Sequence, residues 1–400
     1  MDTIRVFVEP TGRRIAPFDD PIGETPVLNR PLRAWQAEAF ADGGFVVSPT
    51  LEPPCLVVPD TLFASGSALR AFVDAAGGDD AVLVLKHSEF AKMTTPVQPR
   101  VSEVDEGYLF EAVRYVSGRD GIPQRVVVDP LERVINFRLP GQYTGVQDVR
   151  IGLPRRPVMT LHHWVHILWV NQMAAGYEAM ASPMRGTVLR VLWAVLRARS
   201  VNRWKVLRRL STRGKRCDIH PTALIEGSTL GDGVTVGPNA RVLFSRVGDG
   251  ATIMAGAQVE YSVLGERSWV SQDTVLRFSV LYPDALAGYF LQLSVMGRHS
   301  MTVGVAVLDL NVERATRVEL DGALHSSGQQ FLGSAFGHRS RVGAGIFLST
   351  GRMIPNDYLL LGDTRQVLAN IPPGLADAGP LVVADGVVRP LRETESAAIE

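Results

Sequence analysis

The stretch IHPTALIEGSTLGDGVTVGPNA, from Ile219 to Ala240, begins the repeat that decides the fold of this chain. From here to Leu281 an apolar residue recurs every five or six positions, and every third one belongs to the same column. The three columns advance by 17 residues: Ile219, Val236, Ile253, Val270; Ile225, Val242, Val259, Leu276; and Leu230, Val247, Leu264, Leu281. Three short strands per turn with glycines at the corners predict a triangular coil with stacked apolar columns.

The repeat resembles the left-handed parallel β-helix of the hexapeptide-repeat transferases. The resemblance is strict over residues 217–281 and resumes at Phe331–Asn356, so we expect the β-helix to span residues 217–370. The period breaks between these stretches, which predicts an irregular insertion over residues 282–330. For residues 371–400 we expect IPPG at Ile371 to close the coil, then a hairpin in LVVADGVVRPL turning at Asp385 and Gly386, and a frayed tail.

Acyltransferases of that family, by resemblance, are trimers whose active sites lie between neighbouring β-helices. There a histidine acts as general base on a sugar hydroxyl or amine that attacks an acyl thioester, because histidine has an ordinary pKa near neutrality. The candidates are His338, in a regular coil, and then His325 and His299. His220 belongs to the common opening and is expected on the coil surface. Three arginines are candidates for the phosphates of coenzyme A or a sugar nucleotide: Arg339, Arg341 and Arg352.

Residues 1–150 alternate short apolar runs with helical patterns, which predicts an α/β domain with a mostly parallel, Rossmann-like sheet. Within it, Thr11–Phe40 resembles the opening of the sugar nucleotidyltransferases, which have a GT-A-type fold. The resemblance implies that Gly12 and Arg14 belong to a phosphate-binding loop. It also implies that Asp60, at the end of CLVVP, binds Mg²⁺ with a nucleotide or sugar nucleotide.

Two departures from that family's pattern affect the phosphate site. Pro10 stands where the first loop glycine is expected, and proline has no N–H to offer a phosphate. Ile22 stands in the place of the usual lysine. We therefore expect nucleotidyl transfer to be lost, with the pocket kept either as a binding site or as a structural relic. In the second case Asp60 caps the segment that follows its strand.

Residues 151–216 form the predicted helical connector. Its second half, 185–216, holds eleven Arg or Lys and no Asp or Glu, with Leu and Trp at helical spacing. This basic amphipathic pattern fits packing between the domains, contact of residues 185–210 with a membrane surface, or nucleic acid. We discard nucleic acid because no known binding fold accompanies the charge. Upstream, His162–Ala181 predicts an apolar helix in which His162, His163 and His166 pack rather than bind metal.

The composition narrows the setting. The 41 basic residues balance 41 acidic ones, and Cys55 and Cys217 lie too far apart in sequence to suggest a disulfide framework. There is no predicted signal peptide or membrane span, so we expect a cytoplasmic protein, either free or peripheral to the inner face of the membrane.

Two hypotheses follow. The first is a transferase-type protein of sugar-nucleotide or envelope-glycan metabolism, whose N-terminal domain binds nucleotide or sugar nucleotide. Its β-helix then either transfers an acyl group from acetyl or another acyl coenzyme A, or assembles the oligomer. The second is a catalytically silent scaffold or sensor, placed at the membrane surface by its basic helices. Both predict a homotrimer or a multiple of it.

Overall fold

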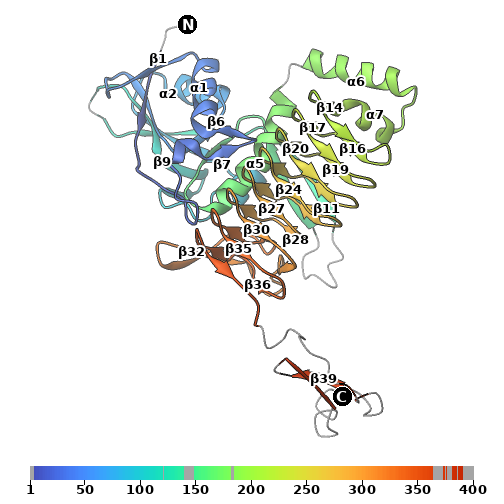
Figure 1. The fold of residues 1–400 in the computed structure, drawn as a ribbon. Coiled ribbons are helices and arrows are strands. Elements are labelled where there is room, and N and C mark those ends of the chain that lie inside the picture. The colour runs from blue at the N-terminus through green and yellow to red at the C-terminus, as the bar shows by residue number, and fades with distance from the viewer. Residues whose placement is uncertain are drawn as a thin grey trace.

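The computed structural model describes residues 4–119, 121–138, 148–181, 184–363, 373, 375, 381–384 and 386–390. An α/β domain lies beside a stack of triangular coils, and a small C-terminal hairpin follows the stack (Figure 1). The IPPG segment and the last ten residues, for which we predicted a coil end and a frayed tail, lie outside the described residues except for Pro373.

The α/β domain is built on one mixed sheet in the order β10-β7-β9-β5-β1-β4, with β8 paired to β9. Its strands are β1 (Ile4–Glu9), β4 (Phe45–Ser48), β5 (Cys55–Pro59), β7 (Ala81–Lys86), β8 (Val101–Val104), β9 (Gly107–Val116) and β10 (Gln124–Val128). β9 runs antiparallel to both β5 and β7, so the sheet is mixed rather than mostly parallel. Apolar runs in the sequence mark strands but do not give their direction.

The helices α1 (Leu32–Asp42), α2 (Gly66–Ala76) and α3 (Glu89–Thr94) pack in this domain. α2 begins at Ser65, whose side chain accepts the N–H of Ala68, and ends at Gly77 in a left-handed conformation. The smaller elements are the 3₁₀ turn η1 (Ile22–Glu24), the ribbon β2 (Pro26–Val27) with β3 (Arg30–Pro31), and the hairpin β11 (Glu132–Arg138) with β12 (Asp148–Pro154).

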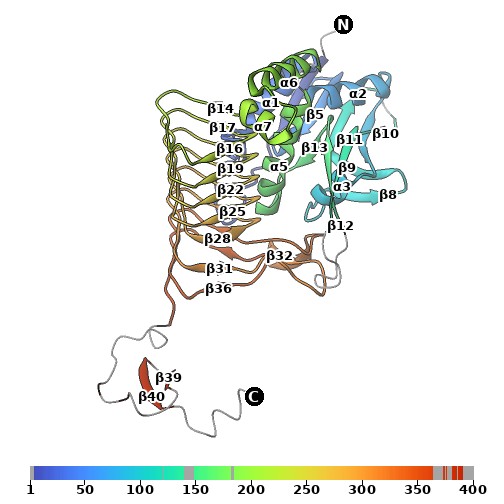
Figure 2. The ribbon, with the colours of Figure 1, turned by 90° about the vertical axis from the view of Figure 1, so that its right-hand side faces the viewer.

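The α/β domain continues past residue 150, where we had placed its end. β13 (Val158–Thr160) pairs with β6 (Leu62–Ala64), and α5 (Trp164–Ala181) shares the core of the domain. α5 is apolar around most of its surface because it lies between the α/β domain and the coils (Figure 2). The basic part of the predicted connector forms α6 (Met184–Ala198) and α7 (Arg203–Leu210).

The coils form three all-parallel sheets, which fit the expected left-handed β-helix. The domain-facing sheet holds β14 (Thr212–Arg213), β17 (Thr229–Leu230), β20 (Arg246–Val247), β23 (Val263–Leu264), β26 (Val280–Leu281), β29 (Val295–Met296), β34 (Ala335–Phe336) and β37 (Met353–Ile354). The second sheet holds β15 (Asp218–Ile219), β18 (Thr235–Val236), β21 (Thr252–Ile253), β24 (Trp269–Val270), β27 (Leu286–Ala287), β30 (Met301–Thr302), β35 (Arg341–Val342) and β38 (Leu359–Leu360). The third sheet holds β16 (Leu224–Glu226), β19 (Arg241–Leu243), β22 (Gln258–Glu260), β25 (Val275–Arg277), β28 (Tyr289–Gln292), β31 (Val305–Val307) and β36 (Phe347–Leu348).

Residues of one predicted column pair with one another on neighbouring strands of the same sheet. Ile219 pairs with Val236, Ile225 with Val242, and Leu230 with Val247, and their side chains lie in one core inside the coil. The predicted irregular segment 282–330 is only partly irregular, because β27 to β31 continue the coil. One coil is short there, since β26 pairs with β29 only 15 residues later. The true insertion follows β31 and carries the hairpin of β32 (Arg317–Leu320) and β33 (Ala323–Ser326).

The domain-facing sheet carries the α/β domain. The outward side chains of Val263, Val280 and Val295 belong to the same core as α5. Asn29 donates its side-chain N–H to the carbonyl oxygen of Leu264 at 2.7 Å, and Arg246 pairs with Glu178 of α5. The predicted C-terminal hairpin is present as β39 (Leu381–Ala384) and β40 (Val387–Pro390), with Gly386 at its turn.

Candidate functional site

The α/β sheet has its topological switch point at β1, because β4 lies on one side of β1 and β5 on the other, both parallel to it. Ligands of open α/β sheets bind at the carboxyl ends of the strands beside such a point. Gly12, Arg14 and Asp60, which we predicted from the sequence, follow β1 and β5 at this edge. Gly12 has φ +64°, a backbone conformation that favours glycine.

The polar groups at this edge bond to one another. Asp60 accepts the Thr11 hydroxyl at 2.6 Å and the Thr11 N–H at 3.1 Å, one on each carboxylate oxygen. Arg14 donates to the main-chain oxygen of Asp19. Among the described residues no group of three or more His, Cys, Asp or Glu could hold a metal ion. In this structure Asp60 caps the loop after β1 through its two bonds to Thr11, and its role as a Mg²⁺ ligand stays a prediction.

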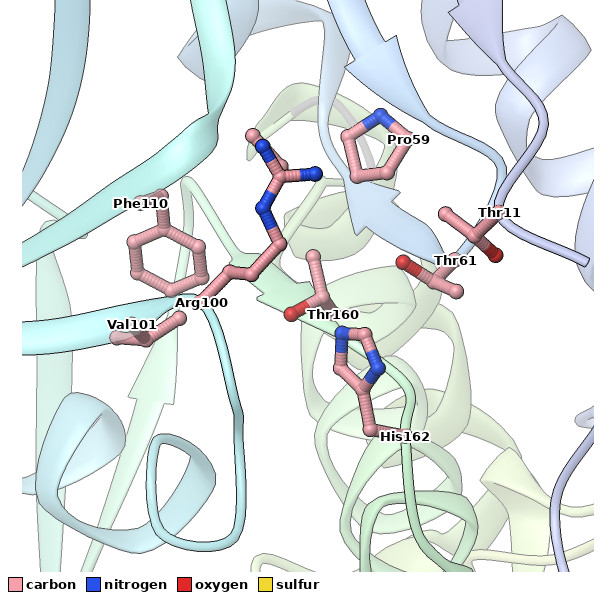
Figure 3. A pocket seen from close by; sticks show the side chains of 9 residues that line it. Thr11, Pro59, Thr61, Arg100, Val101, Phe110, Thr160 and His162 are labelled. Carbon is pink, nitrogen blue, oxygen red and sulfur yellow. The ribbon is translucent and has the colours of Figure 1, made fainter. Parts of the chain in front are cut away.

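The cavity beside the switch point is small, about 20 Å³ (Figure 3). That is room for about one water molecule. His162, which lines the cavity, accepts two hydrogen bonds from Arg13 on its main-chain oxygen, at 3.0 and 3.2 Å. Ile22, at the place of the missing lysine, is a buried core residue. The cavity itself is too small for a nucleotide.

The three clustered histidines are packing residues, as predicted. His166 accepts the main-chain N–H groups of His162 and His163 on Nδ1, at 3.0 and 3.1 Å, and donates from Nε2 to the oxygen of Pro96 at 2.8 Å. Burial lowers the pKa of His166 to about 4 and that of His163 to about 3, so both rings are neutral at pH 7. His163 also bonds to the main-chain oxygen of Glu319 in the insertion at 3.1 Å.

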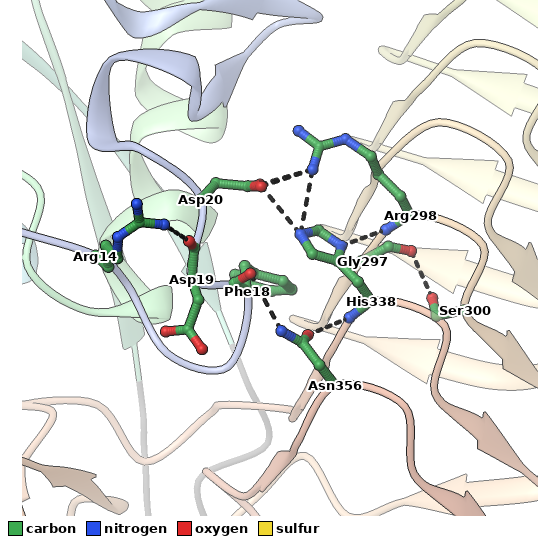
Figure 4. Close-up of polar contacts among 9 residues, drawn as sticks. All are labelled: Arg14, Phe18, Asp19, Asp20, Gly297, Arg298, Ser300, His338 and Asn356. Carbon is green, nitrogen blue, oxygen red and sulfur yellow. Dashed lines mark hydrogen bonds and ion pairs between the residues drawn. The ribbon is translucent and has the colours of Figure 1, made fainter.

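His338 lies where the loop after β1 meets the coils (Figure 4). Its Nδ1 accepts the main-chain N–H of Arg298 at 2.8 Å, which leaves the proton of the neutral ring on Nε2. That Nε2 donates to Asp20 at 3.1 Å. Asn356 accepts the main-chain N–H of His338 at 2.6 Å and donates to the oxygen of Phe18 at 3.2 Å. Both ring nitrogens of His338 are thus engaged, Nδ1 within the coils and Nε2 across the junction between the two domains.

Asp20 is the acceptor at the centre of this junction. Arg298 donates to both of its carboxylate oxygens, at 2.8 and 2.9 Å. Burial alone would raise the pKa of Asp20, but the hydrogen bonds from His338 and Arg298 outweigh it and the pKa is lowered. The rings of Phe18 and Tyr282 stack beside the group with centroids 5.0 Å apart. The junction is a partly buried, ionised contact between domains.

Next to this junction is an open cleft of about 460 Å³, within the size range of small-molecule sites. The loop before Asp20, the insertion hairpin and the last coils form its walls. Its charged lining residues are Asp19, Glu319 and Arg352, and Asn356 links it to the His338 junction. Within the described part of the chain, the exposed guanidinium of Arg352 has no hydrogen-bond or ion-pair partner. One free cation and two carboxylates therefore share one cleft.

The other predicted residues lie apart. His325 is on β33, paired in register with Val318, and His299 is at a coil corner; both are exposed. Arg339 pairs with Asp357 through two hydrogen bonds of 2.5 and 2.7 Å, and Arg341 lies exposed on β35. The sequence analysis singled out neither Asp20 nor Asn356 as a site residue. No local pattern marks either one, because the bond that each makes across the junction joins residues more than 300 positions apart.

No family model matches the chain, and no curated protein matches it either. Among solved structures, a putative acetyltransferase of Bacillus cereus is 18% identical over 38% of this chain and 78% of its own, with a TM-score of 0.14. A variant of GDP-perosamine N-acetyl transferase from Caulobacter crescentus, in complex with CoA and GDP-perosamine, is 12% identical over 38% of this chain and 51% of its own, with a TM-score of 0.14. A hexapeptide transferase family protein of Anaplasma phagocytophilum is 17% identical over 36% of this chain and 78% of its own, with a TM-score of 0.13. At these scores the likenesses carry no functional argument.

Proposed function

We propose that this chain is a transferase-type protein of sugar-nucleotide metabolism that binds a sugar nucleotide or sugar phosphate in the cleft beside the domain junction. The observation that carries the proposal is the unpaired Arg352 in a cleft with Asp19 and Glu319. A guanidinium binds phosphate through charge-assisted hydrogen bonds. Carboxylates accept hydrogen bonds from sugar hydroxyl or amino groups. The three side chains together suit a ligand with a phosphate at one end and a sugar at the other.

The cleft depends on both domains for its shape. Asp19 comes from the loop after β1, Glu319 from the insertion, and Arg352 from the last coils. The bonds of Asp20 to His338 and Arg298 hold that loop against the coils. We infer that ligand binding needs the docked arrangement, and that the edge at Gly12, Arg14 and Asp60 takes no part in nucleotidyl transfer, because Pro10 and Ile22 replace the expected glycine and lysine.

Acyl transfer from an acyl coenzyme A to the bound sugar stays a proposal for the reaction, with His338, His325 and His299 as candidate bases and Arg339 and Arg341 as phosphate contacts. The engagement of both His338 ring nitrogens instead favours a second candidate function, a sensor or scaffold that binds the ligand without chemistry. A His338→Ala variant is assayed both for acyl transfer and for sugar-nucleotide binding. Loss of turnover with binding retained supports His338 as base, and unchanged turnover removes it.

Thermal unfolding with a panel of ligands tests the binding proposal. The panel is a uridine diphosphate sugar, the matching sugar 1-phosphate, UTP and acetyl coenzyme A. A ligand at about 100 times its Kd adds about 2.7 kcal/mol to the free energy of unfolding, so the melting temperature rises. We expect an upward shift with the sugar nucleotide or sugar phosphate, and a smaller one in Arg352→Ala. The absence of any shift across the panel would reject the proposal and leave the scaffold.

A further inference from the structure

The helices α6 and α7 form the outermost layer at the first-coil end of the molecule (Figures 1 and 2). α7 is attached to the first coil: the main-chain oxygen of Leu207 accepts the N–H of Gly227 at 3.1 Å, and Arg208 pairs at 3.1 Å with Glu226, which is buried. α6 in turn packs on α7. The pair is therefore a fixed part of the surface rather than a free tail.

The apolar stripe of α6 faces solvent. Leu189, Leu192, Trp193 and Leu196 have the spacing of one helix face and are 54–73% exposed. Ala194, on another side of the helix, is 1% exposed. Packing between the domains, one of the uses that we considered for this stripe, is thus contradicted for α6. A row of large apolar side chains left in water marks an interaction surface.

Basic groups surround this stripe. The guanidinium of Arg197 lies 4.5 Å from the ring centroid of Trp193, and that of Arg203 lies 4.5 Å from the ring of Trp204, which is also exposed. Arg199, Lys205 and Arg209 are exposed and form no ion pair within the part of the chain that the structure describes. There is no acidic residue anywhere in 185–216. The surface combines exposed Leu and Trp with uncompensated positive charge.

We propose that α6 and α7 form a docking surface for a lipid bilayer with anionic headgroups. Leucine and tryptophan side chains enter the boundary between headgroups and acyl chains, while arginine and lysine remain at the negatively charged headgroup level. Attachment is peripheral, because no helix among the described residues is long and apolar enough to cross a bilayer. A nucleic acid would pair with the arginines but gives the Leu stripe nothing to enter. This surface is independent of the ligand cleft.

Co-sedimentation of the full chain with vesicles tests the proposal. Phosphatidylcholine vesicles are compared with vesicles in which about a third of the lipid is phosphatidylglycerol. We expect binding to the anionic vesicles that weakens as salt is raised. Two variants separate the apolar and the charged contributions to binding. The stripe variant combines Leu192→Ser, Trp193→Ser and Leu196→Ser. The charge variant combines Arg197→Glu and Arg203→Glu. Each lost basic residue lowers binding about fivefold, and the stripe variant abolishes it.

Trp269→Ser, which replaces an exposed tryptophan on β24, is the matched control and should bind as the parent does. All of the substituted side chains are exposed, so circular dichroism should show folded variants. The proposal is overturned if the parent does not sediment with anionic vesicles, or if the stripe variant still does. It is also overturned if the stripe variant changes the mass by light scattering, since the surface is then a subunit contact, or if a duplex oligonucleotide binds and vesicles do not.

Discussion

Asp20 joins the two domains through hydrogen bonds to His338 and Arg298, and its side chain is only 18% exposed. His338 could be chosen from the sequence because it lies in a regular coil next to the irregular segment. Its partner could not, because Asp20 is 318 residues away and only the docking of the domains brings the two together. The same holds for Asn356, whose side chain bonds to the main chain on both sides of the junction.

Replacing Asp20 with Asn should destabilise the protein. The two donors from the coils then lose an ionised acceptor, and we expect the free energy of unfolding to fall by about 1–3 kcal/mol at pH 7. Because the folded state lowers the pKa of Asp20, its contribution is present above the unfolded pKa and is lost as pH falls through the folded one. The difference between parent and variant in urea unfolding should therefore shrink below about pH 4.

Asp357→Asn provides the control for this change. Asp357 pairs with Arg339, each next in sequence to a junction residue, but both side chains are more than half exposed. We expect no measurable change in its urea midpoint. Equal effects of Asp20→Asn and Asp357→Asn would contradict the account of the junction.

The buried His166 should make stability depend on pH. Its folded pKa is about 4, below the ordinary 6.5, because burial disfavours the charged ring. The unfolded chain therefore binds more protons below pH 6.5, and stability falls as the pH is lowered from 6.5 toward 4. From pH 6.5 to 5 the loss is about 2 kcal/mol for one such histidine. His166→Gln should flatten this part of the pH profile, whereas His220→Gln, at an exposed position, should leave it unchanged.

At the scale of elements, the repeat predicted the registers of the first coils but not their corners. The corner between the third and the domain-facing sheets carries buried serines at Ser228, Ser245, Ser262 and Ser279. The hydroxyl oxygen of each accepts the N–H of the serine in the next coil, at 3.1 Å. These serines keep the same 17-residue period as the apolar columns. The row of hydrogen-bonded serines forms a ladder that satisfies main-chain N–H groups and does not fill the core. A search for apolar periodicity alone therefore does not find it.

Ser262→Ala should weaken the coils by breaking this ladder. The change leaves the buried N–H of Ser279 without its acceptor, so we expect the free energy of unfolding to fall by about 1–3 kcal/mol. Ser271→Ala is the control, because the hydroxyl of Ser271 makes no hydrogen bond within the described residues. Chemical denaturation of both variants measures the difference, and an unaltered midpoint for Ser262→Ala would show that water replaces the ladder.

The insertion was placed too early from the sequence for a similar reason. The coil from β26 to β29 is two residues shorter than its neighbours, which breaks the 17-residue period although the strands continue. In the sequence, a shortened coil and an insertion look the same, because both interrupt the 17-residue period. Pairing of β28 with β25 and with β31 distinguishes them, and pairing is visible only in three dimensions.

On the scale of the whole molecule, the α/β domain covers one of the three sheets and leaves the other two open. Large apolar side chains are exposed on these two in the last coils, with Phe347 at 76% and Leu359 at 62%. We expect them to form the contact of the predicted trimer, so light scattering should give three times the chain's 43.5 kDa. Phe347→Asp should lower this mass, and Val46→Asp, at an exposed site on β4, should not. A parent mass of one chain would contradict the trimer.

The two-domain organisation and the apolar core of the coils could be predicted because both depend on local patterns. The ligand cleft could not, because its charged residues come from three separate parts of the chain: Asp19, Glu319 and Arg352. In the sequence, Arg352 was one of three arginines in the coils that were equally good candidates for binding phosphate. What distinguishes Arg352 is that it has no partner among the described residues and lies in a cleft that only the docked domains create.

Calorimetric titration of a uridine diphosphate sugar into the parent, Arg352→Ala and Arg213→Ala tests the central claim most directly. Arg213 is an exposed arginine on β14, at the opposite end of the domain-facing sheet. A hydrogen bond to a charged group contributes about 1.5–3 kcal/mol, so Arg352→Ala should weaken binding about ten- to a hundredfold. The account predicts that Arg213→Ala binds as tightly as the parent. Binding that is equal in all three proteins, or absent from the parent, would contradict it.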